Sequence, residues 1–131
     1  METNAISVAN SLIRIAQENN ESLTLLALMK LVYFAHGFSL AINKHGLLDP
    51  RFDRVEAWRY GPVIPSVYHS FKHNQNRPIT ELSPILRGEL NDGEALFETP
   101  EVTDTEDLTL LEAVYNRYRG KSAGELVNLS H

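Results

Sequence analysis

An apolar run of 20 residues, from Leu23 to Ile42, constrains the fold of this chain more than any other feature. Its length suits a membrane-spanning helix, which needs about 20 apolar residues. Lys30 stands near the middle of the run, however, and a charge at that depth costs about 2.5–3.5 kcal/mol on insertion scales. No flanking anchors or loop charges compensate, so we expect no membrane segment. Because residues 25–43 are apolar on nearly every side, they predict a buried helix at the centre of the fold.

Composition favours a single globular domain, residues 1–131, in a reducing compartment. Of the 131 residues, 43% are apolar and 22% are charged, which is a globular balance. The chain has no cysteine, which excludes disulfides, thiolate nucleophiles and sulfur-based zinc sites. The polar N-terminus lacks the basic head and apolar run of a signal peptide, so a cytoplasmic location is expected. A net charge of −5 argues against a dedicated nucleic-acid binder.

Local patterns in the first half predict helices on both sides of a short strand. Apolar residues repeat on one helical face over residues 4–18, and Thr24 is the expected N-cap of the central helix. Residues 55–58 predict a strand that Tyr60-Gly61-Pro62 ends. Pro65 suits the first turn of the next helix, where its missing N–H is not needed.

The second half predicts either a hairpin or a flexible loop, and then two helices. Asn91-Asp92-Gly93 could form the turn of a hairpin between residues 86–90 and 95–98. Two capping boxes, each a hydroxyl residue followed three positions later by Glu, predict helix starts at Thr103/Glu106 and Ser122/Glu125. The expected fold is therefore mostly α, of the α+β class, a compact helical domain around the central helix with a small antiparallel β element.

Charge is distributed unevenly along the chain. Residues 89–131 carry ten acidic and three basic side chains, and nine of the acids lie between Glu89 and Glu112 without a single base. Such a stretch is either a solvated loop that favours solubility or a docking surface for a basic partner. On the second interpretation, Glu94, Glu98 and Glu101 are candidate partner-binding residues.

No constellation of reactive side chains is recognisable in the sequence. Glycine-rich phosphate loops and the GxSxG motif are missing. His69 and His73 have metal-ligand spacing, but no third ligand completes a site, so two surface histidines are expected. His36 is expected to be a hydrogen-bonded core histidine rather than a general base. A weak cluster of carboxylates comprises Asp49, Asp53 and Glu56. We therefore predict no catalytic residue, no metal and no cofactor.

Four aromatic residues alternate with two basic ones between residues 58 and 72, which raises the question of nucleic-acid binding. A stacking platform would combine exposed aromatic rings with a basic groove. The aromatic spacing favours burial in the core instead, and the local excess of base is small. The residues concerned are Trp58, Arg59, Tyr60, Tyr68, Phe71 and Lys72.

Three segments together carry a resemblance to a known family. They are Thr24 with the helix sequence LMKLVYFAHGF at 28–38, EAWRYGPVIP at 56–65, and KSAGELVNLSH at 121–131. The combination resembles the Panacea antitoxin domain, a phage-associated family formerly described as a domain of unknown function. The last segment departs from the family pattern at Gly124, where a larger helix former is more common. The shared residues, expected to be mainly structural, are Thr24, Lys30, Leu31, Tyr33, Gly37, Glu56, Trp58, Tyr60, Gly61 and Pro62.

The resemblance implies an antitoxin that binds and neutralises a cognate toxin protein encoded nearby, and it implies no enzyme activity. Neutralisation could mask the toxin or deliver it to a protease. The alternative is a phage or prophage adaptor or inhibitor that binds a host protein. Within this picture, Lys30 is expected to lay its stem along the core and reach solvent or a carboxylate. Trp58 is expected to fill core space, and Gly61-Pro62 to set a turn.

Overall fold

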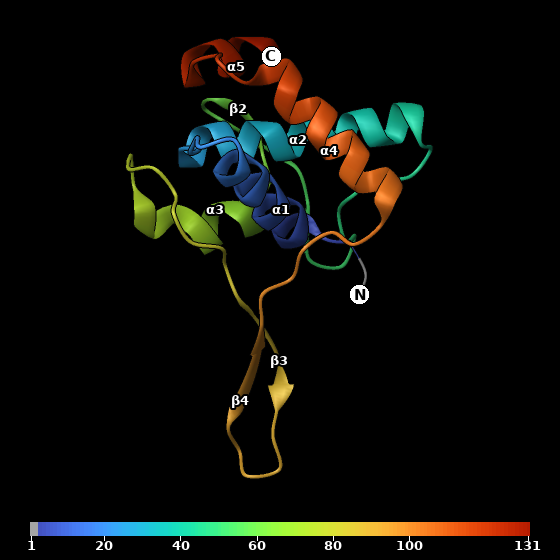
Figure 1. The fold of residues 1–131 in the computed structure, drawn as a ribbon, viewed down its shortest axis with the longest axis vertical. Helices are drawn as coiled ribbons and strands as arrows, with labels where there is room; N and C mark the ends of the chain where they lie inside the picture. Colours follow the sequence, from blue (N-terminus) through green and yellow to red (C-terminus); the bar gives the residue numbers. More distant parts are fainter. Residues whose placement is uncertain (1–2) are drawn as a thin grey trace.

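The computed structural model describes residues 3–131 and confirms a mostly helical α+β fold. Packed helices form the body, and one hairpin projects from it as an arm (Figure 1). The elements are α1 (Ala5–Glu18), α2 (Leu25–Ile42), β1 (Glu56–Trp58), β2 (Gly61–Val63), α3 (Pro65–Phe71), the 3-10 turn η1 (Lys72–Asn74), β3 (Ile85–Glu89), β4 (Ala95–Glu98), α4 (Thr105–Tyr118) and α5 (Ala123–Ser130).

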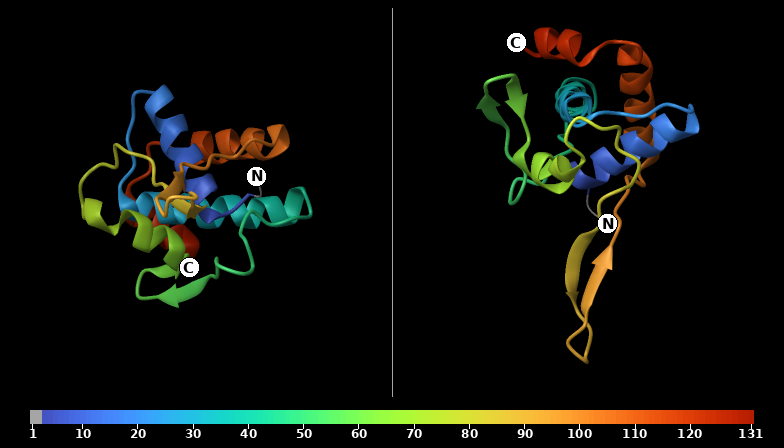
Figure 2. Two further views of the ribbon diagram at one scale, coloured as in Figure 1. Left: turned by 90° about the horizontal axis from the view of Figure 1, so that it is seen from below. Right: turned by 90° about the vertical axis from the view of Figure 1, so that its left-hand side faces the viewer.

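Helix α2 lies at the centre of the body, as its sequence predicts. Seen end-on in the right-hand view of Figure 2, it is surrounded by α1, α4, α5 and the β1–β2 hairpin, and it contacts α1, α4, α5 and β2. Thr24 caps its first turn by accepting a hydrogen bond from the backbone N–H of Ala27. Residues 28–32 of α2 are buried, whereas its last turn emerges from the body and leaves Ile42 63% exposed. The expectation of burial is therefore wrong for that last turn.

By length and composition alone, α2 could cross a membrane, and it is half buried within the protein. The core helices of soluble proteins pass the same test. In the described part of the chain, this helix packs against other helices and contains the buried Lys30, which is the arrangement of a core helix.

Helix α1 is buried on two sides. Its apolar side enters the core through Ala5, Val8, Ala9, Leu12, Ile13 and Ala16, as the spacing predicts. Its polar residues Ser7, Asn10 and Ser11 are buried as well. They are covered partly because the chain segments that lead into and out of the arm lie against this helix.

The region around Gly61 forms a hairpin rather than a single strand. Tyr60-Gly61-Pro62 does not end the β structure, because Gly61 begins a second strand that pairs with Trp58, while Val63 pairs with Glu56. Gly61 has a φ of +94°, a conformation that favours glycine. The two residues between the strands, Arg59 and Tyr60, form the connecting turn.

The other β prediction is confirmed in its hairpin form. β3 and β4 pair antiparallel, with Leu86 opposite Phe97 and a bulge between Leu86 and Gly88. Together with the β1–β2 hairpin this gives two small antiparallel sheets, where one was expected.

Of the two predicted capping boxes, one is correct. Ser122 and Glu125 form a reciprocal box at the start of α5. The box predicted from Thr103 and Glu106 is wrong by one residue, because Asp104 is the N-cap of α4 and accepts from the backbone N–H of Asp107. A carboxylate one position later offers the same acceptor to the free N–H groups.

Candidate partner-binding surfaces

The side chain of Lys30 is fully buried in α2 and holds the β1–β2 turn in place. Its ammonium donates to the carbonyl oxygens of Tyr60, at 2.6 Å, and Pro62, at 2.9 Å. The expectation that it reaches solvent or a carboxylate is therefore wrong. The turn offers two carbonyl oxygens within a short distance of each other, and these accept from the ammonium, which forms no ion pair within residues 3–131. Burial lowers the pKa of Lys30.

The three segments that carry the family resemblance meet at Gly61. A Cβ atom at this position would lie 3.0 Å from Ser130 Oγ, 3.1 Å from Lys30 Nζ and 3.3 Å from His131 Cε1. Contacts this short are rare for real Cβ atoms, and the positive φ adds strain. A glycine is thus required where residues from α2, β2 and the C-terminal segment converge.

Beside this convergence, the β1–β2 turn presents large side chains to solvent. Trp58 is 38% exposed and Tyr60 is 53% exposed. The indole N–H of Trp58 donates to Glu56 at 3.0 Å, and its ring packs edge-on against Tyr68, with 5.1 Å between centroids. The Arg59 guanidinium lies over the Tyr60 ring at 5.6 Å. We call Trp58, Arg59 and Tyr60 the aromatic turn.

The prediction that the aromatic cluster is buried is therefore wrong for Trp58 and Tyr60. It is half right for Tyr68, which is partly covered, and right for Phe71, which is 1% exposed. The short β1–β2 sheet lies at the edge of the body (Figure 2), and Trp58 and Tyr60 beside its turn are exposed. The Gly-Pro pair after Tyr60 was the available signal that these residues flank a turn.

Among the other family-motif residues, Leu31, Tyr33 and Glu56 contact neighbouring side chains, whereas Gly37 does not show why it is a glycine. Leu31 is buried in the core beside Lys30, and Tyr33 is partly buried. Glu56 binds Trp58 and also Arg54, at 2.5 Å, and these hydrogen bonds lower its pKa. A Cβ at the exposed Gly37 would meet no described heavy atom within 4 Å, so packing does not explain a glycine there.

The β3–β4 hairpin, which we call the arm, extends away from the helices along the long axis of the molecule (Figures 1 and 2). Leu86 is 62% exposed and Phe97 is 61% exposed. Because these two residues are directly opposite each other in the ladder, their side chains share one face of the arm.

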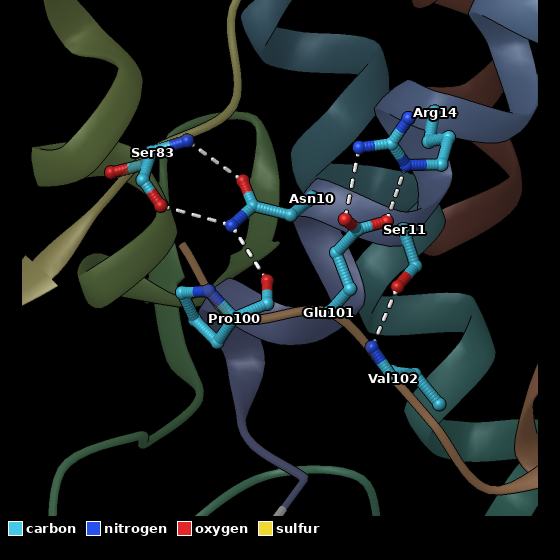
Figure 3. Close-up of polar contacts among 7 residues, drawn as sticks. All are labelled: Asn10, Ser11, Arg14, Ser83, Pro100, Glu101 and Val102. Carbon is cyan, nitrogen blue, oxygen red and sulfur yellow. Dashed lines mark hydrogen bonds and ion pairs between the residues drawn. The ribbon is translucent and has the colours of Figure 1, made fainter. Parts of the chain in front are cut away.

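Both strands of the arm are attached to α1 at their base by a group of polar contacts (Figure 3). The Asn10 amide donates to the carbonyl oxygens of Ser83, at 2.9 Å, and Pro100, at 2.8 Å, and it accepts from the N–H of Ser83 at 2.8 Å. Ser11 accepts from the N–H of Val102 at 2.8 Å. We call these contacts the clamp. Sequence reasoning missed Asn10, since a lone polar residue on a helix gives no sign of a distant partner.

The three acidic candidates occupy different environments. Glu101 forms a two-pronged pair with Arg14 of α1, at 2.5 and 2.9 Å, and Glu98 pairs with Arg87 within the arm at 2.5 Å. Glu94 is exposed just after the turn of the arm. The structure therefore does not bring the three carboxylates into one site, and their role in binding remains a prediction.

His36 and Asp53, two of the titratable residues considered in the sequence, form hydrogen bonds with other parts of the fold. His36 is hydrogen-bonded as expected, since it accepts from the N–H of Leu47 at 3.0 Å, but it is only partly buried. This burial lowers its pKa. Asp53 accepts from the N–H groups of Ala5 and Asp49 and from the Ser66 hydroxyl.

The histidine pair at metal-ligand spacing does not share a helix. His69 lies on α3, whereas His73 falls in η1. Within residues 3–131, no group of three His, Asp or Glu side chains is placed to hold a metal ion.

Comparison with known proteins identifies the family. The model of the family described as "Antitoxin SocA-like, Panacea domain" matches residues 28–131. The chain belongs to this Panacea family. A curated relative in the family, Antitoxin SocA of Caulobacter vibrioides (strain NA1000 / CB15N), is 33% identical over 127 residues, which are 97% of this chain and 64% of the relative. The chain thus spans slightly less than two thirds of the length of that antitoxin. No solved structure matches.

Proposed function

We propose that this Panacea protein is a cytoplasmic antitoxin that binds and neutralises a toxin protein encoded by a neighbouring gene. Family membership supports an antitoxin role. The observation that carries the binding function is the aromatic turn: Trp58 and Tyr60 are exposed on a segment whose backbone is fixed from within by Lys30.

Physical chemistry makes such a turn a good binding surface. Trp, Tyr and Arg are the residue types that contribute most to protein–protein affinity, and all three are adjacent here. Their backbone is already ordered by the two Lys30 hydrogen bonds, so binding does not need to order it. Neutralisation would then follow from covering a functional surface of the toxin.

The experiment is co-expression with the protein encoded by the neighbouring reading frame. Expression of that protein alone should stop growth, and co-expression of this chain should restore growth and yield a complex that co-purifies. Trp58→Ala combined with Tyr60→Ala should weaken both effects, whereas Ile42→Ala, at an exposed apolar residue of α2, should not. If the chain neither binds that protein nor restores growth, the proposal is wrong.

A further inference from the structure

We propose that the arm inserts into an apolar pocket of the toxin that is framed by lysine and arginine side chains. This inference rests on the proposed antitoxin function and adds a second contact surface and the chemistry of the partner's complementary site.

The apolar part of the arm is the Leu86–Phe97 face. A two-stranded hairpin is marginally stable by itself, yet this one presents two large apolar side chains to water, each more than 60% exposed. Exposed apolar residues gathered on one projection mark an interaction surface. Leu90 and Leu96 are also exposed and lie nearer the turn of the hairpin.

The clamp gives the arm a fixed direction before any partner binds. Asn10 ties the backbone on both sides of the arm to α1, since Ser83 precedes β3 and Pro100 follows β4. The ion pair between Arg14 and Glu101 adds a further attachment (Figure 3). A projection that is anchored at its base and free along its length is suited to enter a pocket with little loss of conformational entropy.

Charge determines which partner fits. The segment 85–98 contains four acids and one base, and the base, Arg87, is already paired with Glu98. The remaining carboxylates, Glu89, Asp92 and Glu94, lie around the turn at the outer end, where no ion pair to them is formed within residues 3–131. A complementary pocket would supply cations around an apolar centre. Anionic lipids, nucleic acids and the acidic arm of a second copy would all be repelled.

The test measures association of this protein with the protein encoded by the neighbouring reading frame over a series of salt concentrations. Leu86→Ser with Phe97→Ser should weaken binding at least about tenfold, mostly through faster dissociation. Glu89→Gln, Asp92→Asn and Glu94→Gln together should slow association several-fold and reduce its dependence on salt. The controls are Leu40→Ser with Ile42→Ser on α2, and the charge variant Glu18→Gln with Glu81→Gln, at acids outside the stretch 89–112.

A second measurement needs no variant: hydrogen exchange of the wild-type protein should become slower over residues 85–98 when the complex forms. The arm proposal is overturned if the wild-type protein binds, the arm variants bind as well as the controls do, and residues 85–98 gain no protection from exchange. The antitoxin proposal then still stands. If the wild-type protein does not bind, the antitoxin proposal fails and the arm assignment fails with it.

Discussion

His45 and Asp107 connect the segment after α2 to the first turn of α4, with 2.9 Å between the imidazole Nε2 and the carboxylate Oδ1. The histidine is half exposed, while Asp107 is buried. The hydrogen bond to Asp107 is the main reason that the pKa of His45 is raised above its ordinary value of 6.5.

The first prediction concerns this pair and pH. A raised pKa in the folded state means that protonation stabilises the fold, so the contribution is fully present below the unfolded pKa and is lost as pH rises through the folded pKa. His45→Gln should therefore lower the melting temperature more at about pH 5.5 than at about pH 8.5. Melting curves of both proteins at the two pH values measure this, and an equal decrease at both would contradict it.

The second prediction separates Trp58 from the core. Burial of Trp58 was the expectation from sequence, with a loss of about 3–5 kcal/mol on truncation. Because this side chain is partly exposed, Trp58→Ala should reduce the free energy of unfolding by only about 1–2 kcal/mol. Phe71→Ala, at a buried core residue, should reduce it by about 3–5 kcal/mol. Urea denaturation of the two variants compares them directly, and equal losses would place Trp58 in the core after all.

The third prediction concerns Lys30. Lys30→Met keeps an unbranched apolar stem but removes the ammonium, which leaves the carbonyl oxygens of Tyr60 and Pro62 without their donor. The free energy of unfolding should fall by about 1–3 kcal/mol. Trp58 is the chain's single tryptophan, so its fluorescence reports on the loosened turn and should shift toward longer wavelength. An unchanged spectrum would mean that the turn does not depend on Lys30.

The fourth prediction concerns the clamp. Asn10→Ala leaves buried backbone groups of Ser83 and Pro100 without hydrogen-bond partners. Each group that water does not reach should lower the free energy of unfolding by about 1–3 kcal/mol. Asn10→Asp is the matched variant, because it retains the acceptor for the Ser83 N–H but removes both donors. Both variants should lower stability and speed hydrogen exchange over residues 83–102, with Asn10→Asp adding repulsion between its carboxylate and two carbonyl oxygens. Exchange that stays as slow as in the wild-type protein would show that the arm is held by other contacts.

The sequence predicted those parts of the fold that local signals determine. Thr24 and the apolar residues after it specify α2, and Asn91-Asp92-Gly93 specifies the turn of the arm, because capping and turn preferences act over a few residues. The N-cap of α4 was predicted one residue too early, because Thr103 and Asp104 offer equivalent capping oxygens. No periodicity in the sequence distinguishes the two.

The candidate site was harder to predict because it depends on contacts between distant segments. Whether Trp58 is buried is decided by the position of a short sheet at the edge of the body, and the spacing of aromatic residues does not contain that information. Likewise, the partner of Lys30 is the backbone of a turn 30 residues later, and any residue type could supply a carbonyl oxygen there. Side-chain identity therefore could not indicate the pairing.

The clamp has a practical consequence for protein production. The family match begins at residue 28, yet α1 supplies Asn10, Ser11 and Arg14, which hold the arm, as well as much of the apolar core. An expression fragment cut at the family boundary would lack these groups and would expose the surfaces of α2 and α4 that α1 covers. The smallest fragment worth crystallising, labelling or screening for binders is thus one that retains the first helix.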